Sequence, residues 1–195
     1  MKYKISSTKA NKNSKNKNSK MEVIIMNIFR TKVREMKAVY KKVTEITILG
    51  QKFELQVAYK NIKVTELNFE NKEVKVLLPL KFKNKDIGKI LNIILDKMYE
   101  QIAKNETEAI MEKIRTKLKF APEDYKIAFI KNTMAKCNNQ KEIVINPYIM
   151  RYDLPTVEYI ILHEYCHLKY KTHSKGFWEL IKKAMPKYEE FAYAA

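Results

Sequence analysis

The three histidines of this chain all lie within eleven consecutive residues, in the stretch HEYCHLKYKTH that begins at His163. His163 and His167 are four residues apart, in a segment whose apolar residues recur at helical spacing. A helix of about 100° per residue places both imidazoles on one face, one turn apart. The stretch therefore predicts a helix from about residue 155 to 170 and restricts the path that the chain takes afterwards.

Two imidazoles in this arrangement can bind one metal ion, at roughly 2.0–2.1 Å each. Glu164 flanks them and completes an HExxH pattern, in which zinc acidifies water and the glutamate takes the proton. A catalytic zinc needs a third protein ligand, and His173 supplies one if the chain turns back past the end of the helix. Tyr170 stands where the metzincin pattern has a glycine, so this is not a metzincin. A chance surface pair is the alternative, but the apolar helix and the gathering of every histidine favour a metal site.

The rest of the chain predicts an α+β fold. Residues 43–80 alternate apolar with polar side chains, which is typical of an antiparallel β-meander with one face in water. Helical spacing follows at 85–104 and 106–119, with Asn105 as a capping residue between two helices. Two short strands in 125–146 then predict a hairpin that turns near Asn138 and Asn139. Helices complete the region 154–195, where Asp153 or Thr156 caps the first and Ser174 the second.

The N-terminal segment differs sharply in composition. Residues 1–20 are a Lys/Asn/Ser-rich sequence that we expect to be disordered, and 21–42 have apolar residues at helical spacing opposite a basic face. Residues 1–42 carry a net charge of +11 out of the total of +17. A basic tail raises nucleic-acid binding as a hypothesis, although lysine with so little arginine is a weak signal for it.

Other features bound the environment of the protein. Two cysteines, Cys137 and Cys166, are too few for a disulfide scaffold. No stretch of the sequence is long and apolar enough to span a bilayer, and the apolar run near the N-terminus lacks a cleavage site. We expect a reduced, cytoplasmic protein, a monomer, with Cys166 in the core and Phe177 and Trp178 packing behind the histidines.

The segment VEYIILHEYCHLKYKTHSKGFWELIKKAMPKYEE closely resembles the core motif of the YgjP-like metallopeptidase domain, a zincin family with the pattern HELxHLxxxxHSxxFW. The resemblance covers about 43–190. It implies a minimal zincin-like domain over 43–195, one zinc ion bound by His163, His167 and His173, and Glu164 as the catalytic acid/base. Two departures stand out: Met134–Cys137 replaces a Trp-Gly-Ser-Cys-like stretch, and Tyr165 replaces a leucine.

Three hypotheses follow. The first is a zinc-dependent metallopeptidase that hydrolyses peptide bonds in a peptide or protein substrate, with Glu164 as general base. The second is a DNA-associated protease similar to the WLM and SprT groups, anchored through the basic N-terminal tail. The third is a catalytically degenerate, zinc-stabilised adaptor, suggested by the altered stretch at Met134–Cys137.

Overall fold

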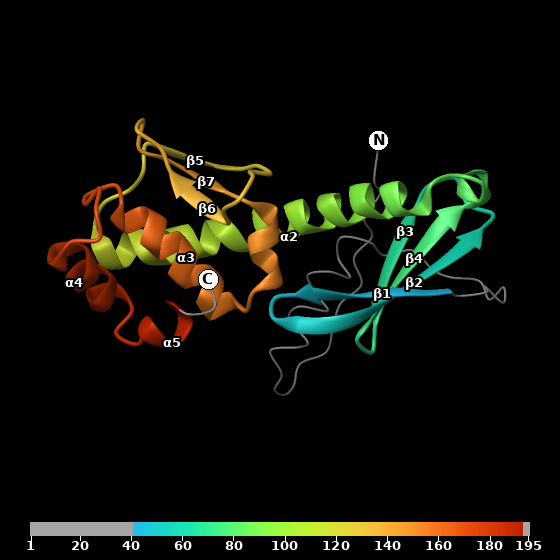
Figure 1. Cartoon of the computed structure of the whole chain (residues 1–195), viewed down its shortest axis with the longest axis horizontal. Coiled ribbons are helices and arrows are strands. Elements are labelled where there is room, and N and C mark those ends of the chain that lie inside the picture. Colours follow the sequence, from blue (N-terminus) through green and yellow to red (C-terminus); the bar gives the residue numbers. More distant parts are fainter. Residues whose placement is uncertain (1–40, 193–195) are drawn as a thin grey trace, which may run out of the picture. The chain divides into compact units, whose positions relative to one another are not determined.

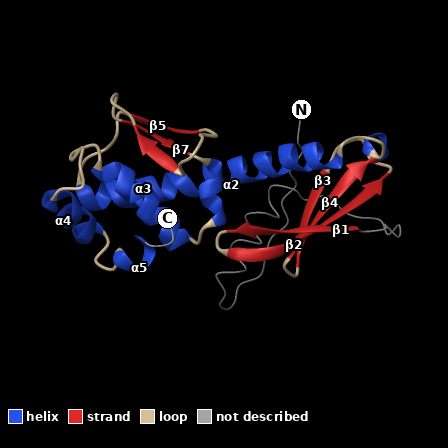
Figure 2. Cartoon of the chain, viewed as in Figure 1, coloured by secondary structure: helices blue, strands red, loops and turns tan. Residues whose placement is uncertain are grey.

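The structure is a computed structural model that describes residues 41–192, and it describes side chains from Glu45 onward. The chain forms two compact units: one runs to Ile46 and from Lys52 to Ile87, and the other holds Thr47–Gln51 together with everything from Gly88. Helices and mixed sheets are both present, which confirms the predicted α+β class (Figure 2). The predicted disordered tail and nearly all of the predicted helix 21–42 lie outside the described residues; Lys41 and Lys42 begin the first strand.

A four-stranded sheet makes up most of the first unit (Figure 1). Its strands lie in the order β1-β2-β4-β3 and span β1 Lys41–Ile48, β2 Gln51–Lys60, β3 Glu66–Glu70 and β4 Glu73–Pro79. The predicted meander is wrong, because β2 pairs with β4 in parallel and β3 lies outside β4. Residues 61–65 between β2 and β3 are a loop and not a tight turn, so the chain can cross to the far side of β4. Alternation specifies which face of a strand is buried but carries no information about strand order.

The turns of this sheet follow local chemistry. Asn71 and Lys72 both have positive φ (48° and 64°), as the two-residue hairpin between β3 and β4 requires. Leu49 and Gly50 do the same between β1 and β2, with φ of 48° and 76°. A short 3-10 helix, η1 Leu80–Phe82, follows β4.

Helix α2 runs without a break from Ile87 to Leu118, so the expected division at Asn105 is wrong. Asn105 is exposed, and its side chain accepts a hydrogen bond from Gln101 (3.1 Å) instead of capping a new helix. Buried residues continue at spacings of three and four on both sides of it, from Ile102 through Ile110 to Ile114. Burial of this continuous stripe outweighs the weak helix propensity of a single asparagine.

The second unit contains a three-stranded sheet in the order β5-β7-β6, formed by β5 Asp124–Ile127, β6 Ala135–Cys137 and β7 Glu142–Ile145. The predicted hairpin is only partly right. The turn near Asn138 is present, but it joins β6 to β7, and β5 pairs with β7 in parallel. Strand β6 has three residues, too few for alternation to reveal it. It forms one edge of this sheet.

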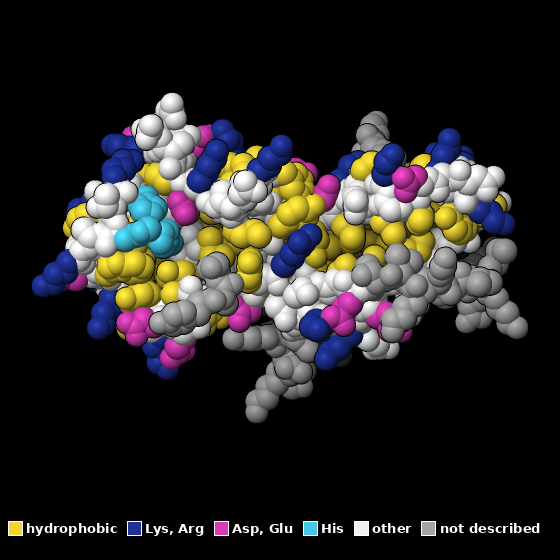
Figure 3. Space-filling view, viewed as in Figure 1, with side chains coloured by type: hydrophobic (Ala, Val, Ile, Leu, Met, Phe, Trp, Pro, Cys, Tyr) yellow, Lys and Arg dark blue, Asp and Glu magenta, His cyan; other side chains and the backbone are white. Residues whose placement is uncertain are grey.

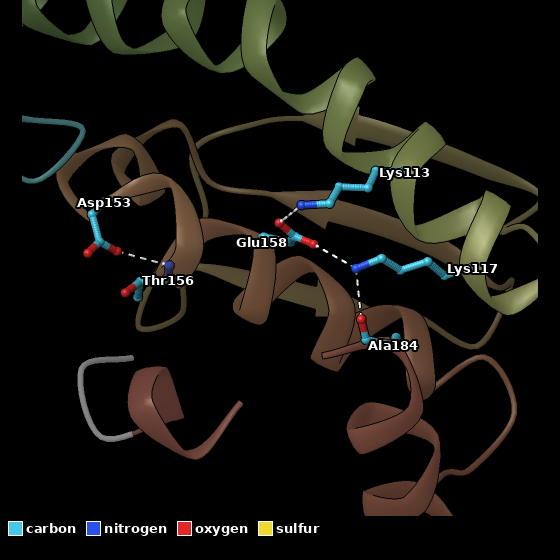
Figure 4. A network of polar contacts seen from close by, with 6 residues as sticks. All are labelled: Lys113, Lys117, Asp153, Thr156, Glu158 and Ala184. Carbon is cyan, nitrogen blue, oxygen red and sulfur yellow. Dashed lines mark hydrogen bonds and ion pairs between the residues drawn. The ribbon is translucent and has the colours of Figure 1, made fainter. Parts of the chain in front are cut away.

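Helix α3, Leu154–Cys166, packs against β6, β7 and the helices that follow it. These are α4 Lys175–Ala184 and α5 Glu189–Ala192, and the 3-10 helix η2 Pro147–Arg151 precedes α3. The predicted cap is Asp153, whose carboxylate accepts a hydrogen bond from the Thr156 N–H (2.9 Å) (Figure 4). Gly50 lies against this cap, where a Cβ would come within 2.8 Å of Asp153, so the turn before β2 has no room for a side chain.

One half-buried carboxylate ties three helices together. Glu158 of α3 pairs with Lys113 and Lys117 of α2, and Lys117 also donates to the carbonyl of Ala184 (2.7 Å), the last residue of α4 (Figure 4). The ammonium group thereby satisfies a carbonyl that the end of α4 leaves without a helical partner. This network fixes the helix that carries His163 relative to the helix that follows His173.

Candidate metal centre

The structure brings the three histidines together. The Nε2 atom of His163 lies 3.2 Å from Nε2 of His167 and 2.9 Å from Nε2 of His173. Three nitrogen ligands of one tetrahedral zinc at about 2.05 Å would lie roughly 3.3 Å apart. All three ligand atoms fall within 4.8 Å of one another, and no other such group occurs in the described residues. The donor set, its convergence and its spacing fit a zinc ion.

A tight turn, and not a glycine, brings His173 back to the helix. Helix α3 ends at Cys166, earlier than the sequence predicts, and His167 is its C-cap. The N–H groups of Lys169 and Tyr170 both donate to the carbonyl of Cys166 (3.1 and 3.0 Å), which tightens the end of the helix. Every residue of this turn has negative φ, so tyrosine is accepted at position 170.

Gly176 is a site residue that the sequence did not reveal. A Cβ at this position would come within 2.9 Å of the Tyr170 ring. The first turn of α4 therefore lies against the Tyr170 ring, and a side chain at residue 176 would require that ring to move. The glycine within the HSKGFW stretch was the available signal.

The imidazoles are oriented by neighbours behind them. Nδ1 of His167 lies 2.9 Å from the carbonyl oxygen of Tyr170, so a proton on Nδ1 is donated there and Nε2 is left with its lone pair. Phe177 is fully buried, and its ring centroid lies 5.0, 4.8 and 4.7 Å from those of His163, His167 and His173. It backs the whole cluster.

Aromatic rings also link the two ends of the cluster. His173 stacks on Trp178 (5.6 Å), Trp178 stacks on Tyr188 (5.7 Å), and Tyr188 stacks on Tyr159 (6.3 Å). Tyr159 in turn meets His163 edge-on at 6.0 Å. The sequence indicated the contribution of Trp178 but not those of the two tyrosines, because only the fold brings α3 and the segment after α4 together.

Burial keeps His163 neutral. Desolvation, with smaller contributions from the two neighbouring imidazoles, lowers the pKa of His163 from 6.5 to about 4. The ring is therefore unprotonated at neutral pH, as a metal ligand must be.

Glu164 is held by the edge strand of the small sheet. Its Oε2 accepts a hydrogen bond from the Cys137 backbone N–H (2.8 Å). In the register of β6 with β7, Lys136 faces its partner Val144, and the backbone groups of Cys137 point outward toward α3. Burial raises the pKa of Glu164, while the bond from Cys137 and the nearby His167 act in the opposite direction.

A cavity of about 580 Å³ opens beside Glu164 and His163. In Figure 3 the histidines form one patch at the surface, flanked by hydrophobic side chains. Ten further residues line the cavity: Ile130, Asn132, Thr133, Met134, Ala135, Asn146, Tyr148, Tyr159, Ile160 and Ala192. The altered stretch that begins at Met134 therefore forms part of the wall beside the candidate site.

The two cysteines and Tyr165 lie near the histidines in the sequence or in the fold, but their side chains are not part of the candidate metal centre. Cys166 is fully buried, burial raises the pKa of its thiol to about 12, and it is not among the converging ligands. Tyr165, which replaces the leucine of the family pattern, is 1% exposed, and its hydroxyl donates to the Phe120 carbonyl (2.7 Å) within the core. Cys137 and Cys166 are both free thiols.

No helix in the described residues is long and apolar enough to cross a membrane.

An α+β domain whose histidines converge beside a half-buried glutamate is typical of metal-dependent hydrolases. The model of the family described as "YgjP-like, metallopeptidase domain" matches residues 9–193. The chain belongs to this family, which confirms the resemblance seen in the sequence. It is accordingly a metallopeptidase, and its family implies a bound metal.

No curated protein matches the sequence. Among solved structures, the chain is similar to the metallopeptidase zymogen of Pyrococcus abyssi abylysin. The two are 25% identical over 45% of this chain and 89% of that one, with a TM-score of 0.41.

Proposed function

We propose that the protein is a zinc-dependent peptidase that binds one zinc ion through His163, His167 and His173 and uses Glu164 as its general base. The observation that carries the proposal is the convergence of three imidazole Nε2 atoms, with separations of 3.2 and 2.9 Å, beside a half-buried carboxylate and an open cavity. A zinc ion supplies Lewis acidity, which polarises a carbonyl group and lowers the pKa of water. The peptide or protein substrate would enter from the cavity.

Glu164 moves the protons in this scheme. The hydrogen bond from Cys137 occupies Oε2 and fixes the carboxylate, so we assign the proton transfer to Oε1. Because burial makes this carboxylate more basic than an exposed glutamate, it accepts a proton from water more readily. It then passes that proton to the leaving amine.

The three proposed zinc ligands come from two parts of the chain. His163 and His167 come from one helix, and their mutual position is set by helical spacing. His173 comes from the loop before α4 and is placed by stacking on Trp178. Neutral His163 needs no deprotonation before it binds a metal at pH 7.

The test combines metal analysis with cleavage of a broad peptide library. Wild-type protein should purify with one zinc per chain, His163→Ala should lose it, and Glu164→Gln should keep it but lose hydrolysis by at least about a hundredfold. Glu108→Gln, on an exposed face of α2, is the matched control and should retain both metal and activity. A wild-type protein without stoichiometric zinc, or a fully active Glu164→Gln variant, would contradict the proposal.

The two other hypotheses are outcomes of the same experiment and its extension. A zinc-loaded protein that unfolds on chelation and cleaves no peptide would indicate a structural adaptor. Salt-dependent DNA binding that disappears on deletion of residues 1–42 would favour the DNA-associated protease.

A further inference from the structure

The cavity beside Glu164 has an apolar wall. Apolar and aromatic side chains supply much of it, from the loop before β6, from the first residue of β6, from α3 and from α5. They include Ile130, Met134, Ala135, Tyr159, Ile160 and Ala192. Ile160 is one turn before His163 and Glu164, so the apolar surface and the candidate reacting groups share one face of the helix.

Three of the polar side chains of the wall, Asn146, Thr133 and Tyr148, already have partners within the protein. Asn146, which is 4% exposed, donates through Nδ2 to the carbonyls of Ile130 (2.9 Å) and Thr133 (3.1 Å), and its Oδ1 accepts from the Tyr148 N–H (3.1 Å). The Thr133 hydroxyl donates to the Ala135 carbonyl (2.6 Å), and the Tyr148 hydroxyl donates to Asp96. These groups brace the wall and are not directed to a ligand.

Charge is also missing from the wall. Apart from His163 and Glu164, which belong to the candidate metal centre, no described residue that lines the cavity is an acid, a histidine, a lysine or an arginine. A charged substrate side chain would lose water there with no charged partner among the described lining residues other than the groups of the candidate metal centre, whereas an apolar side chain would gain from leaving water. The size of the cavity, about 580 Å³, is within the range of ligand pockets.

We propose that this cavity is the specificity pocket of the enzyme, and that it selects peptides with a large apolar residue, leucine or phenylalanine, flanking the bond to be cleaved. The proposal rests on the proposed peptidase function and adds the chemical class of the substrate. Met134 is the residue best placed to set the preference. Its side chain lines the cavity and is half-buried, while its carbonyl is held by the Asn146 N–H (2.8 Å), so the side chain can be changed with the backbone kept in place.

The first experiment measures binding and not turnover. Zinc-loaded, full-length Glu164→Gln protein is titrated with blocked Gly/Ser peptides that carry one variable central residue: leucine, phenylalanine, alanine, aspartate or lysine. The amide oxygen that this substitution introduces can still accept the hydrogen bond from the Cys137 N–H, so the cavity keeps its shape. Leucine and phenylalanine peptides should bind at least about tenfold tighter than the alanine peptide, and the charged peptides weaker still. Equal affinity for all five peptides, or a preference for a charged one, overturns the proposal that the cavity is an apolar specificity pocket.

The second experiment changes the wall in the same background. Met134→Glu should weaken binding of the leucine peptide at least about tenfold and strengthen binding of the lysine peptide. The volume-conserving Met134→Leu should leave both affinities within about threefold of the values for the unaltered wall. A Met134→Glu protein that still prefers leucine overturns the assignment of Met134. If Met134→Glu does not fold, the five-peptide series on the unaltered wall decides the proposal.

The two proposals can fail separately. Leucine-selective binding by a zinc-loaded wild-type protein that cleaves no peptide would support the pocket and contradict the peptidase function. Cleavage that is indifferent to the side chain would support the peptidase function and contradict the pocket.

Discussion

Phe177 should control metal affinity although it has no atom that can bind a metal. Its ring backs all three imidazoles at centroid distances of 4.7 to 5.0 Å and is fully buried. The change Phe177→Leu keeps an apolar side chain in the core but removes the flat surface against which the rings rest. We expect weaker zinc binding with the three histidines intact.

The magnitude follows from what the ring supports. Loss of a group that orients metal ligands typically costs about 10–100-fold in affinity. At about 1.4 kcal/mol per factor of ten, the stabilisation that saturating zinc gives to the folded protein should fall by about 1.4–2.7 kcal/mol. The metal-free variant should lose about 1–3 kcal/mol of unfolding free energy, from imperfect repacking and the lost ring contacts. Zinc competition against a fluorescent chelator and denaturant unfolding with and without zinc measure the two quantities.

Ile181→Val is the matched control. Ile181 is on the same helix, is also fully buried, and should lose about 0.5–1.5 kcal/mol of stability. Because Ile181 has no ring that supports the imidazoles, the Ile181→Val variant should bind zinc as tightly as the wild type. The reasoning is refuted if Phe177→Leu binds zinc as tightly as the wild type, or if both variants lose affinity equally.

Three further outcomes are expected. Glu158→Gln should cost about 1 kcal/mol of unfolding free energy, because Glu158 is half-buried between two lysines, whereas Glu190→Gln in an exposed pair should change almost nothing by the same urea titration. Asn146→Asp removes both donors to the carbonyls of Ile130 and Thr133 and should lower the unfolding free energy by at least about 2 kcal/mol. The exposed control Asn139→Asp should leave it unchanged. Equal urea midpoints for the two variants would contradict the role of Asn146 in bracing the cavity wall. The lowered pKa of His163 means that the folded metal-free protein binds fewer protons than the unfolded chain between pH 6.5 and about 4, so its stability should fall as the pH is lowered through that window; His163→Asn should flatten this slope.

The fold shows which structural information periodicity carries. Side-chain alternation over 43–80 indicated strands but could not show that β2 and β4 lie side by side in parallel, because strand order depends on the path of the loop at 61–65. Asn105 suggested a helix boundary by its local preference, and a buried stripe on both sides of it kept α2 continuous. Three-residue β6 gave no periodic signal at all.

The candidate metal centre was more accessible to sequence reasoning, because its parts lie close together along the chain. Helical spacing predicts the neighbouring positions of His163 and His167, and the structure brings His173 to them. The partner of Glu164 was not predictable, since Cys137 is 27 residues away and reaches it only through the outward-facing edge of β6. The contribution of Tyr188 was not predicted either, because only the fold brings the segment after α4 next to α3.

The way α4 is attached has a consequence for the exchange of the metal. Phe177 and Ile181 anchor this helix through carbon contacts, and Lys117 holds its last carbonyl, so none of these attachments passes through the histidines' nitrogens. The loop from His167 to His173 is short, and closing it costs little chain entropy. An ion at this site would therefore be exchangeable without loss of the fold: chelation should abolish activity while the protein stays folded, and added zinc should restore activity within the time of mixing.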